Sequence, residues 1–146
     1  LKEIEDESVD AVWACHVVEH CYYHDLPNVF GSMMRVIKKD GFVVVRVPDL
    51  GSIADMIKED ILQPVYDSEA GPIRPLDMIY GHAGFVQQWG PGMCHKTGFT
   101  VKSMGQILES LGIKAMIRNT GGHEVAAVLY KDKVPLNFLN MNGCII

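Results

Sequence analysis

SVDAVWACHVVEH (Ser8–His20) and RVIKKDGFVVVRVP (Arg35–Pro48) are the two stretches that decide the fold predicted for this chain. Within the first, Asp10–Ala14 is a short apolar run. Within the second, Phe42–Val47 is β-branched almost throughout. Such runs are typical of strands that are covered on both faces of a sheet. The sequence therefore predicts two buried strands at these positions.

The residues between the two strands predict a helix. Asp25 is expected to cap it, Pro27 is tolerated in its first turn, and Gly41 is expected to end it. A strand, a crossover helix and a second strand in about 40 residues form a βαβ unit. Its strands should be parallel, and its crossover should be right-handed.

The last third of the chain predicts a helix followed by a hairpin. Thr100 is expected to cap a helix that runs through Leu111 and ends before a glycine. Ile113–Arg118 and Glu124–Tyr130 then predict two strands, joined by the glycine-rich turn Asn119–Gly122.

These motifs resemble, in the same order, a class I S-adenosylmethionine-dependent methyltransferase of the methyltransferase type 11 kind. SVDAVWACHVVEH…DLPNVFGSMMRVIKKDGFVVVRVPDL is similar to the middle of that family, and HKTGFTVKSMGQILESLGIKAMIRNTGG to its closing helix and final hairpin. The resemblance implies an α/β fold: a partial Rossmann-like sheet of two parallel strands plus a C-terminal antiparallel hairpin. Flanking helices and an irregular insert would complete it. It also implies methyl transfer from S-adenosylmethionine to an unknown acceptor.

The resemblance implies only the C-terminal half of such an enzyme. In the family, a strand that runs into a glycine-rich loop and a later strand that ends in an acid hold the cofactor; both would precede Leu1. Gly90–Gly92 follows no predicted strand and does not qualify as that loop. We therefore expect a truncated methyltransferase domain over residues 1–132, with an insert at 51–99 and a tail at 133–146. Alone, it is expected to be inactive.

The resemblance places the cofactor beside the end of the first strand. Ala14, Cys15 and His16 would contact it mainly through their backbone, with His20 just behind them. Open α/β sheets bind ligands beyond the carboxyl ends of their strands, which agrees with this placement. The alternative is a strand end whose polar groups only satisfy hydrogen bonds of the loop.

Candidate substrate-pocket residues are Asp49, His82, Trp89 and His95. Asp49 ends the second strand, where it would either orient a nucleophile or cap the following helix. The other three lie in the 51–99 insert, which is rich in aromatic, Met, Gly and Pro residues and is too long for a simple connection. We expect a short helix at Asp55–Leu62. The rest of the insert is expected to form a lid over a small-molecule pocket, a local core, or a layer packed on the bare side of the sheet.

The cluster of His16, His20, Cys21 and His24 has residue types that suit zinc, and three histidines at four-residue spacing would share one helical face. His16 is expected in the turn after a strand, however, which breaks that face. No fourth ligand has a usual spacing. The sequence therefore assigns no metal site.

Composition excludes several classes of function. The net charge is −5 and the lysines are dispersed, so no basic face for nucleic acid is expected. No apolar run approaches the roughly 20 residues of a membrane span. The cysteines, with no paired spacing, are expected to be free thiols in the cytoplasm; they are Cys15, Cys21, Cys94 and Cys144.

The first strand would be central in a complete methyltransferase sheet. Without upstream strands it becomes an edge, which is prone to pair with another chain. We therefore expect either a homodimer through this edge or an insert at 51–99 that covers it. The alternative to an enzyme is a non-catalytic interaction module that uses the same edge and the apolar tail.

Overall fold

The computed structural model describes residues 1–133, and the predicted tail beyond Lys133, with Cys144, lies outside the described residues. The main sheet has the order β1-β2-β6-β5. β1 and β2 are parallel, whereas β6 is antiparallel to both of its neighbours. The fold class predicted from the sequence is confirmed. The strands of this sheet are β1 (Val9–Cys15), β2 (Ile37–Pro48), β5 (Lys114–Asn119) and β6 (Glu124–Tyr130).

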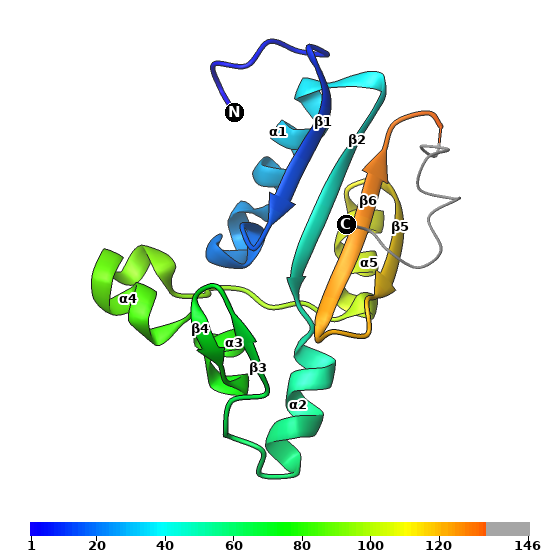
Figure 1. Cartoon of the computed structure of the whole chain (residues 1–146). Coiled ribbons are helices and arrows are strands. Elements are labelled where there is room, and N and C mark those ends of the chain that lie inside the picture. Colours follow the sequence, from blue (N-terminus) through cyan, green and yellow to red (C-terminus); the bar gives the residue numbers. More distant parts are fainter. Residues whose placement is uncertain (134–146) are drawn as a thin grey trace.

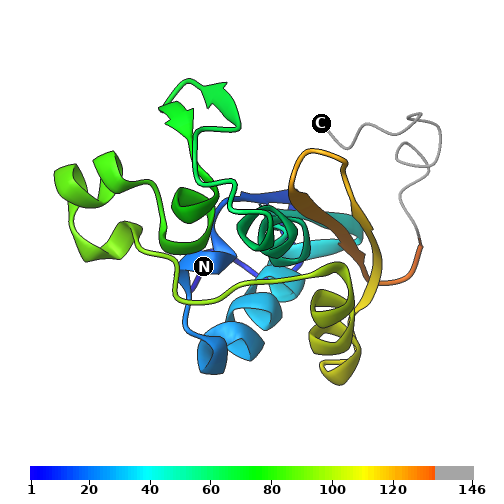
Figure 2. The same ribbon diagram turned by 90° about the horizontal axis from the view of Figure 1, so that it is seen from below.

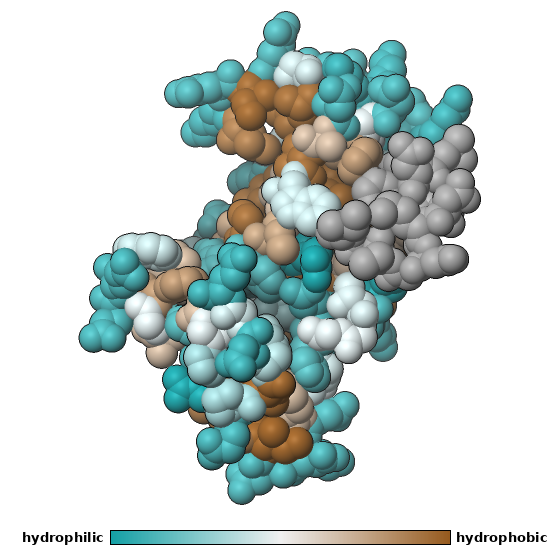
Figure 3. Space-filling model, in the orientation of Figure 1, coloured by the Kyte–Doolittle hydropathy of each residue, from teal (hydrophilic) through white to brown (hydrophobic). Residues whose placement is uncertain are grey.

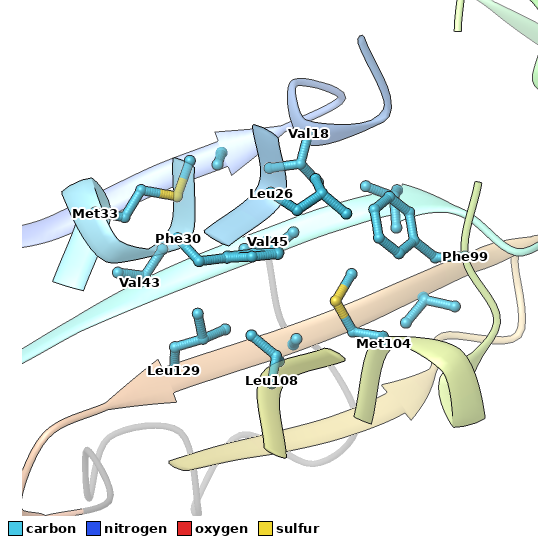
Figure 4. Close-up of a cluster of buried hydrophobic side chains, with 14 of the residues drawn as sticks. Val18, Leu26, Phe30, Met33, Val43, Val45, Phe99, Met104, Leu108 and Leu129 are labelled. Atoms are coloured by element: carbon cyan, nitrogen blue, oxygen red, sulfur yellow. The ribbon is translucent and has the colours of Figure 1, made fainter. Parts of the chain in front are cut away.

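Two helices cover one face of this sheet: α1 (Leu26–Val36) and α5 (Val101–Ser110). They lie on the same side of the strands (Figure 2). The main core fills the space between them and the sheet. Figure 4 shows Phe30 of α1 beside Val45 of β2, and Leu108 of α5 over the β6 strand. α5 begins as predicted, because the Thr100 hydroxyl accepts a hydrogen bond from the backbone N–H of Ser103 at 3.1 Å.

The predicted end of the first helix at Gly41 is wrong. α1 ends at Val36, because Ile37 turns to an extended conformation and is buried as the first residue of β2. The pairing of β1 with β2 then shifts register before Phe42. Gly41 lies where a Cβ would approach the Asp10 carbonyl oxygen to 2.8 Å. The glycine therefore permits close passage of two strands rather than ending a helix.

The predicted cap of this helix is also absent. Asp25 precedes α1 but makes no capping hydrogen bond through its side chain. It is the last residue of a 3₁₀ turn, η2 (Tyr23–Asp25), and already has helical dihedral angles. A capping side chain usually needs an extended backbone at its own position.

The insert contains a small unit attached below the sheet (Figure 1). Its first helix, α2 (Leu50–Lys58), starts five residues earlier than predicted because Asp49 caps it through the backbone N–H of Gly51 at 3.0 Å. Ile53, Met56, Ile73 and Met78 form a second buried cluster, so the predicted local core is present. The other elements of the insert are β3 (Tyr66–Ser68), β4 (Gly71–Ile73), α3 (Pro75–Tyr80), α4 (Ala83–Trp89) and η3 (Pro91–Met93). Outside the insert, the short helix η1 (Val18–His20) follows β1.

β1 is at the edge of the four-stranded sheet formed by the described residues. Figure 3 shows apolar side chains around this strand and a second apolar area at the end of α2. Trp13 of β1 is 53% exposed, although Ala14 beside it is buried under the helices. No helix within residues 1–133 has the length and apolar character that crossing a membrane requires.

Candidate functional site

A cavity of about 320 Å³ lies beyond the carboxyl ends of β1 and β2. This is the edge at which open α/β sheets bind ligands. One wall comes from the turn after β1, and the insert supplies most of the rest. Its lining is unusually rich in histidine, with His16, His20, His82 and His95 all contributing. From the insert, Tyr66, Ser68, Asp77, Met78, Phe85 and Met93 also face this space.

His16 lies in the turn that follows β1. Its φ of 52° is in the left-handed region, and its backbone N–H donates to the Arg46 carbonyl at 2.9 Å. This turn places the ring between two acids. Nδ1 lies 3.1 Å from Oε1 of Glu19, and Nε2 lies 2.8 Å from Oε1 of Glu124.

These carboxylates determine the charge of His16. The hydrogen bond with Glu124, and to a smaller extent that with Glu19, raises the pKa of His16 to about 9. At neutral pH an imidazolium therefore donates to both carboxylates. The ring is 45% exposed, so solvent screens part of this attraction. Burial would raise the pKa of Glu124, but hydrogen bonds from His16 and Arg46 outweigh it and lower that pKa. With both nitrogens protonated, His16 is an ion-pair partner rather than a general base.

Glu19 is the most buried charged residue beside the cavity, with 1% of its surface exposed. Its Oε1 accepts from His16, whereas its Oε2 has no hydrogen-bond partner among the described residues. Its backbone carbonyl accepts from the N–H groups of Lys96 at 2.8 Å and Thr97 at 3.1 Å. These two bonds fix the segment that carries His95 against η1.

His20 and His95 meet edge to face, with 4.8 Å between their ring centroids. Nδ1 of His20 donates to the Cys94 carbonyl at 3.3 Å, and Nδ1 of His95 donates to the Met78 carbonyl at 2.9 Å. Burial lowers the pKa of His95, so its imidazole is neutral at pH 7. Its Nε2 therefore carries a lone pair that can bind a proton or a metal ion.

The structure separates the predicted cofactor-binding residues. His16 and His20 line the cavity, whereas Ala14 is buried in the core and Cys15 does not belong to the wall. Burial raises the pKa of the Cys15 thiol, which keeps it protonated and a poor nucleophile. Whether these residues contact a cofactor stays a prediction.

The predicted substrate-pocket residues also divide into two pairs. His82 and His95 line the cavity, but Asp49 and Trp89 are not part of its wall. Asp49 is buried at the end of β2, where it caps α2 and accepts a hydrogen bond from the side-chain amide of Asn119. Trp89 is exposed and stacks on Phe85. Glu19 and Glu124 were not predicted as site residues. Glu19 could have been found from its place beside His20 after the first strand, whereas no local pattern marks Glu124.

Comparisons with known proteins agree with this architecture. A profile of the family described as "Methyltransferase domain" matches residues 1–45. The fold is similar to that of the "DhpI-SAH complex structure", with a TM-score of 0.56 and 12% identity. This match covers 91% of this chain and 52% of the other. The chain has the class I methyltransferase fold.

Two archaeal structures share this fold. PH0226 from Pyrococcus horikoshii OT3 has a TM-score of 0.53 and 18% identity, over 89% of this chain and 55% of that one. A SAM dependent methyltransferase from Archaeoglobus fulgidus has a TM-score of 0.50 and 15% identity, over 88% of this chain and 62% of that one. The chain therefore spans about half the length of the solved structures that it matches. No curated protein matches it in sequence.

Proposed function

We propose that this chain forms the acceptor-facing part of an S-adenosylmethionine-dependent methyltransferase. The observation that carries the proposal is the cavity at the carboxyl ends of β1 and β2, in a sheet of methyltransferase fold. The similar DhpI structure is a complex with S-adenosylhomocysteine (SAH), the demethylated cofactor. In our proposal the turn after β1 lies closest to the transferred methyl group.

The described residues fit only one side of this cofactor. Within residues 1–133 no strand runs into a glycine-rich loop at a helix N-terminus. Two acids beside the cavity are fully paired: Glu124 with His16 and Arg46, and Asp77 with Arg74. Neither is free to hold ribose hydroxyls. We therefore assign to these residues the face toward the methyl group and the acceptor.

When bound, the cofactor supplies an electrophilic methyl group on a sulfonium. The task of this chain's residues is then to align an acceptor and exclude water. Neutral His95 lines the acceptor side of the cavity, whereas the imidazolium of His16 fixes the turn after β1 through its two carboxylate partners. The aromatic rings of Tyr66 and Phe85 supply apolar contact on the insert side.

Titration of the ¹⁵N-labelled chain with SAH tests the proposal. We expect weak binding, with a Kd above about 100 μM (roughly −5.5 kcal/mol), because residues 1–133 form only one side of the site. Amide shifts should be confined to residues 14–16 and 20 and to the cavity wall. A second, separate groove lies between α5 and β5, where Leu108 and Ile117 are among its lining residues. Shifts only in this groove, or none at millimolar SAH, would contradict the proposal and favour the non-catalytic interaction module.

The outer edge of β1 supports a second part of the proposal, a homodimer. No strand among residues 1–133 pairs with this edge, and Trp13 beside it is exposed. We expect light scattering to give twice the 16.2 kDa of one chain. Trp13→Lys should weaken the dimer by placing a charge at the edge, whereas Tyr23→Lys, 66% exposed in η2, should not. A monomer at every concentration would exclude the homodimer.

Free Cys15, Cys21 and Cys94 support a cytoplasmic location, which is also part of the proposal.

A further inference from the structure

Three potential metal ligands meet at the wall of the cavity. One ligand atom from each of Glu19, His20 and His95 lies within 4.8 Å of the other two. Glu19 and His20 belong to η1, whereas His95 comes from the far end of the insert. Two imidazoles and one carboxylate are a donor set that binds divalent transition metals and leaves further coordination positions open.

The hydrogen bonds of the two histidines prepare them for a metal ion. A carbonyl oxygen only accepts, so the contacts of His20 and His95 with the carbonyls of Cys94 and Met78 require a proton on each Nδ1. In the neutral ring Nε2 then carries the lone pair. No described residue hydrogen-bonds to either Nε2. Metal-binding histidines commonly donate their other N–H to a backbone carbonyl in this way.

Glu19 supplies an independent observation. Its carboxylate is almost fully buried, and its Oε2 lacks a hydrogen-bond partner among the described residues. A buried charged oxygen without a partner is costly and rare, so each one calls for a physical explanation. A bound cation would satisfy this oxygen. The other oxygen accepts from His16 at 3.1 Å, which orients the carboxylate as an outer-sphere partner would.

The backbone holds the three residues together. The Glu19 carbonyl accepts from two successive N–H groups, those of Lys96 and Thr97, and the Lys96 ammonium donates to the His20 carbonyl at 3.1 Å. A tetrahedral metal with bonds of about 2.1 Å needs ligands about 3.4 Å apart, so ligand atoms that lie up to 4.8 Å apart must close by at most about 1.4 Å. Side-chain rotation can supply that movement without a change in the fold.

We propose that Glu19, His20 and His95 bind one divalent transition-metal ion, with Zn²⁺ as the best match to the donor set. His20 and His95 line the cavity, so an open coordination position faces it. A water molecule or an oxygen or nitrogen atom of a cavity ligand would occupy that position. The inference does not depend on the proposed methyl transfer, because metal binding can be measured without cofactor or acceptor.

Titration of the metal-free 146-residue chain with Co²⁺ tests the site by visible absorption, and displacement by Zn²⁺ gives the relative affinity. We expect one equivalent to bind with d–d bands of nitrogen and oxygen ligation. His95→Ala and Glu19→Gln should each lower the affinity at least about 100-fold, since loss of an outer-sphere partner alone commonly costs 10–100-fold. His24→Ala is the matched control, because that exposed ring lies outside the cluster, and it should bind normally.

A strong thiolate-to-cobalt charge-transfer band would place the metal on cysteines and overturn the assignment. Equal Co²⁺ affinity in His95→Ala and His24→Ala would overturn it too. If a variant fails to fold, ¹H–¹⁵N spectra of the imidazoles in the unmodified chain decide the matter. Zn²⁺ should shift Nε2 of His20 and His95 and leave His24 in place; unchanged His20 and His95 signals would exclude the site.

Discussion

Replacement of Phe30 by alanine is expected to lower the free energy of unfolding by about 3–5 kcal/mol. Phe30 is fully buried and joins α1 to the sheet, where Figure 4 shows it beside Val45. The change removes an aromatic ring from the main core and leaves a cavity between a helix and two strands. Whole domains are commonly stable by only about 5–15 kcal/mol, so this loss is a large share of the total.

Urea unfolding followed by circular dichroism measures this effect. The midpoint for Phe30→Ala should fall steeply, with little change in the slope. Tyr23→Ala is the matched control, because it removes an aromatic ring that is mostly exposed and should change stability by less than about 0.5 kcal/mol. Equal midpoints for the two variants would show that α1 is not packed on the sheet as described.

Local signals explain why much of the sheet could be predicted from the sequence. The run Phe42–Val47 is β-branched almost throughout because β2 is buried between β1 and β6. Thr100 caps α5 through a residue three positions away, and the turn Asn119–Gly122 connects two strands that are adjacent in sequence. These features depend only on neighbouring residues, so they can be recognised from the sequence alone.

The errors in the predicted elements arise where tertiary contacts decide the outcome. Gly41 looks like a helix end, but its role is to let β2 pass close to the Asp10 carbonyl of β1. α2 begins early because Asp49 caps it, one of the two roles expected for this residue, but the same carboxylate is also held by Asn119 from the distant hairpin. Neither long-range contact can be read from neighbouring residues.

The candidate site depends on the same kind of contact. His16 and His20 could be proposed from their place after the first strand, because the end of a strand is a local feature. Their partners Glu124 and His95 come from the hairpin and from the insert, and no spacing rule connects them. His16, His20, Cys21 and His24 are close in sequence, so they could be compared as a set of ligands, whereas the meeting of His20 with His95 depends on the folded insert.

Gly81→Ala is expected to disrupt the cavity strongly, because the methyl group would meet backbone rather than a flexible side chain. Gly81 has a φ of 96°, and a Cβ there would clash with the Met93 carbonyl oxygen. That atom belongs to the backbone just before His95, so it cannot turn away as a flexible side chain would. The segment 93–95 must move, and His95 with it. We therefore expect loss of stability together with loss of Co²⁺ binding.

Gly90→Ala is the matched control, because it shows the effect of a strained backbone conformation without a steric clash. Gly90 also has a positive φ, 83°, but a Cβ there meets nothing within 4 Å. Its substitution should therefore show only the strain of a glycine conformation, about 1–3 kcal/mol, with Co²⁺ affinity retained. Gly81→Ala should exceed that loss and also move the imidazole signals of His95. If the two variants are equally stable and bind Co²⁺ equally well, the close contact between Gly81 and the Met93 carbonyl does not hold the site together.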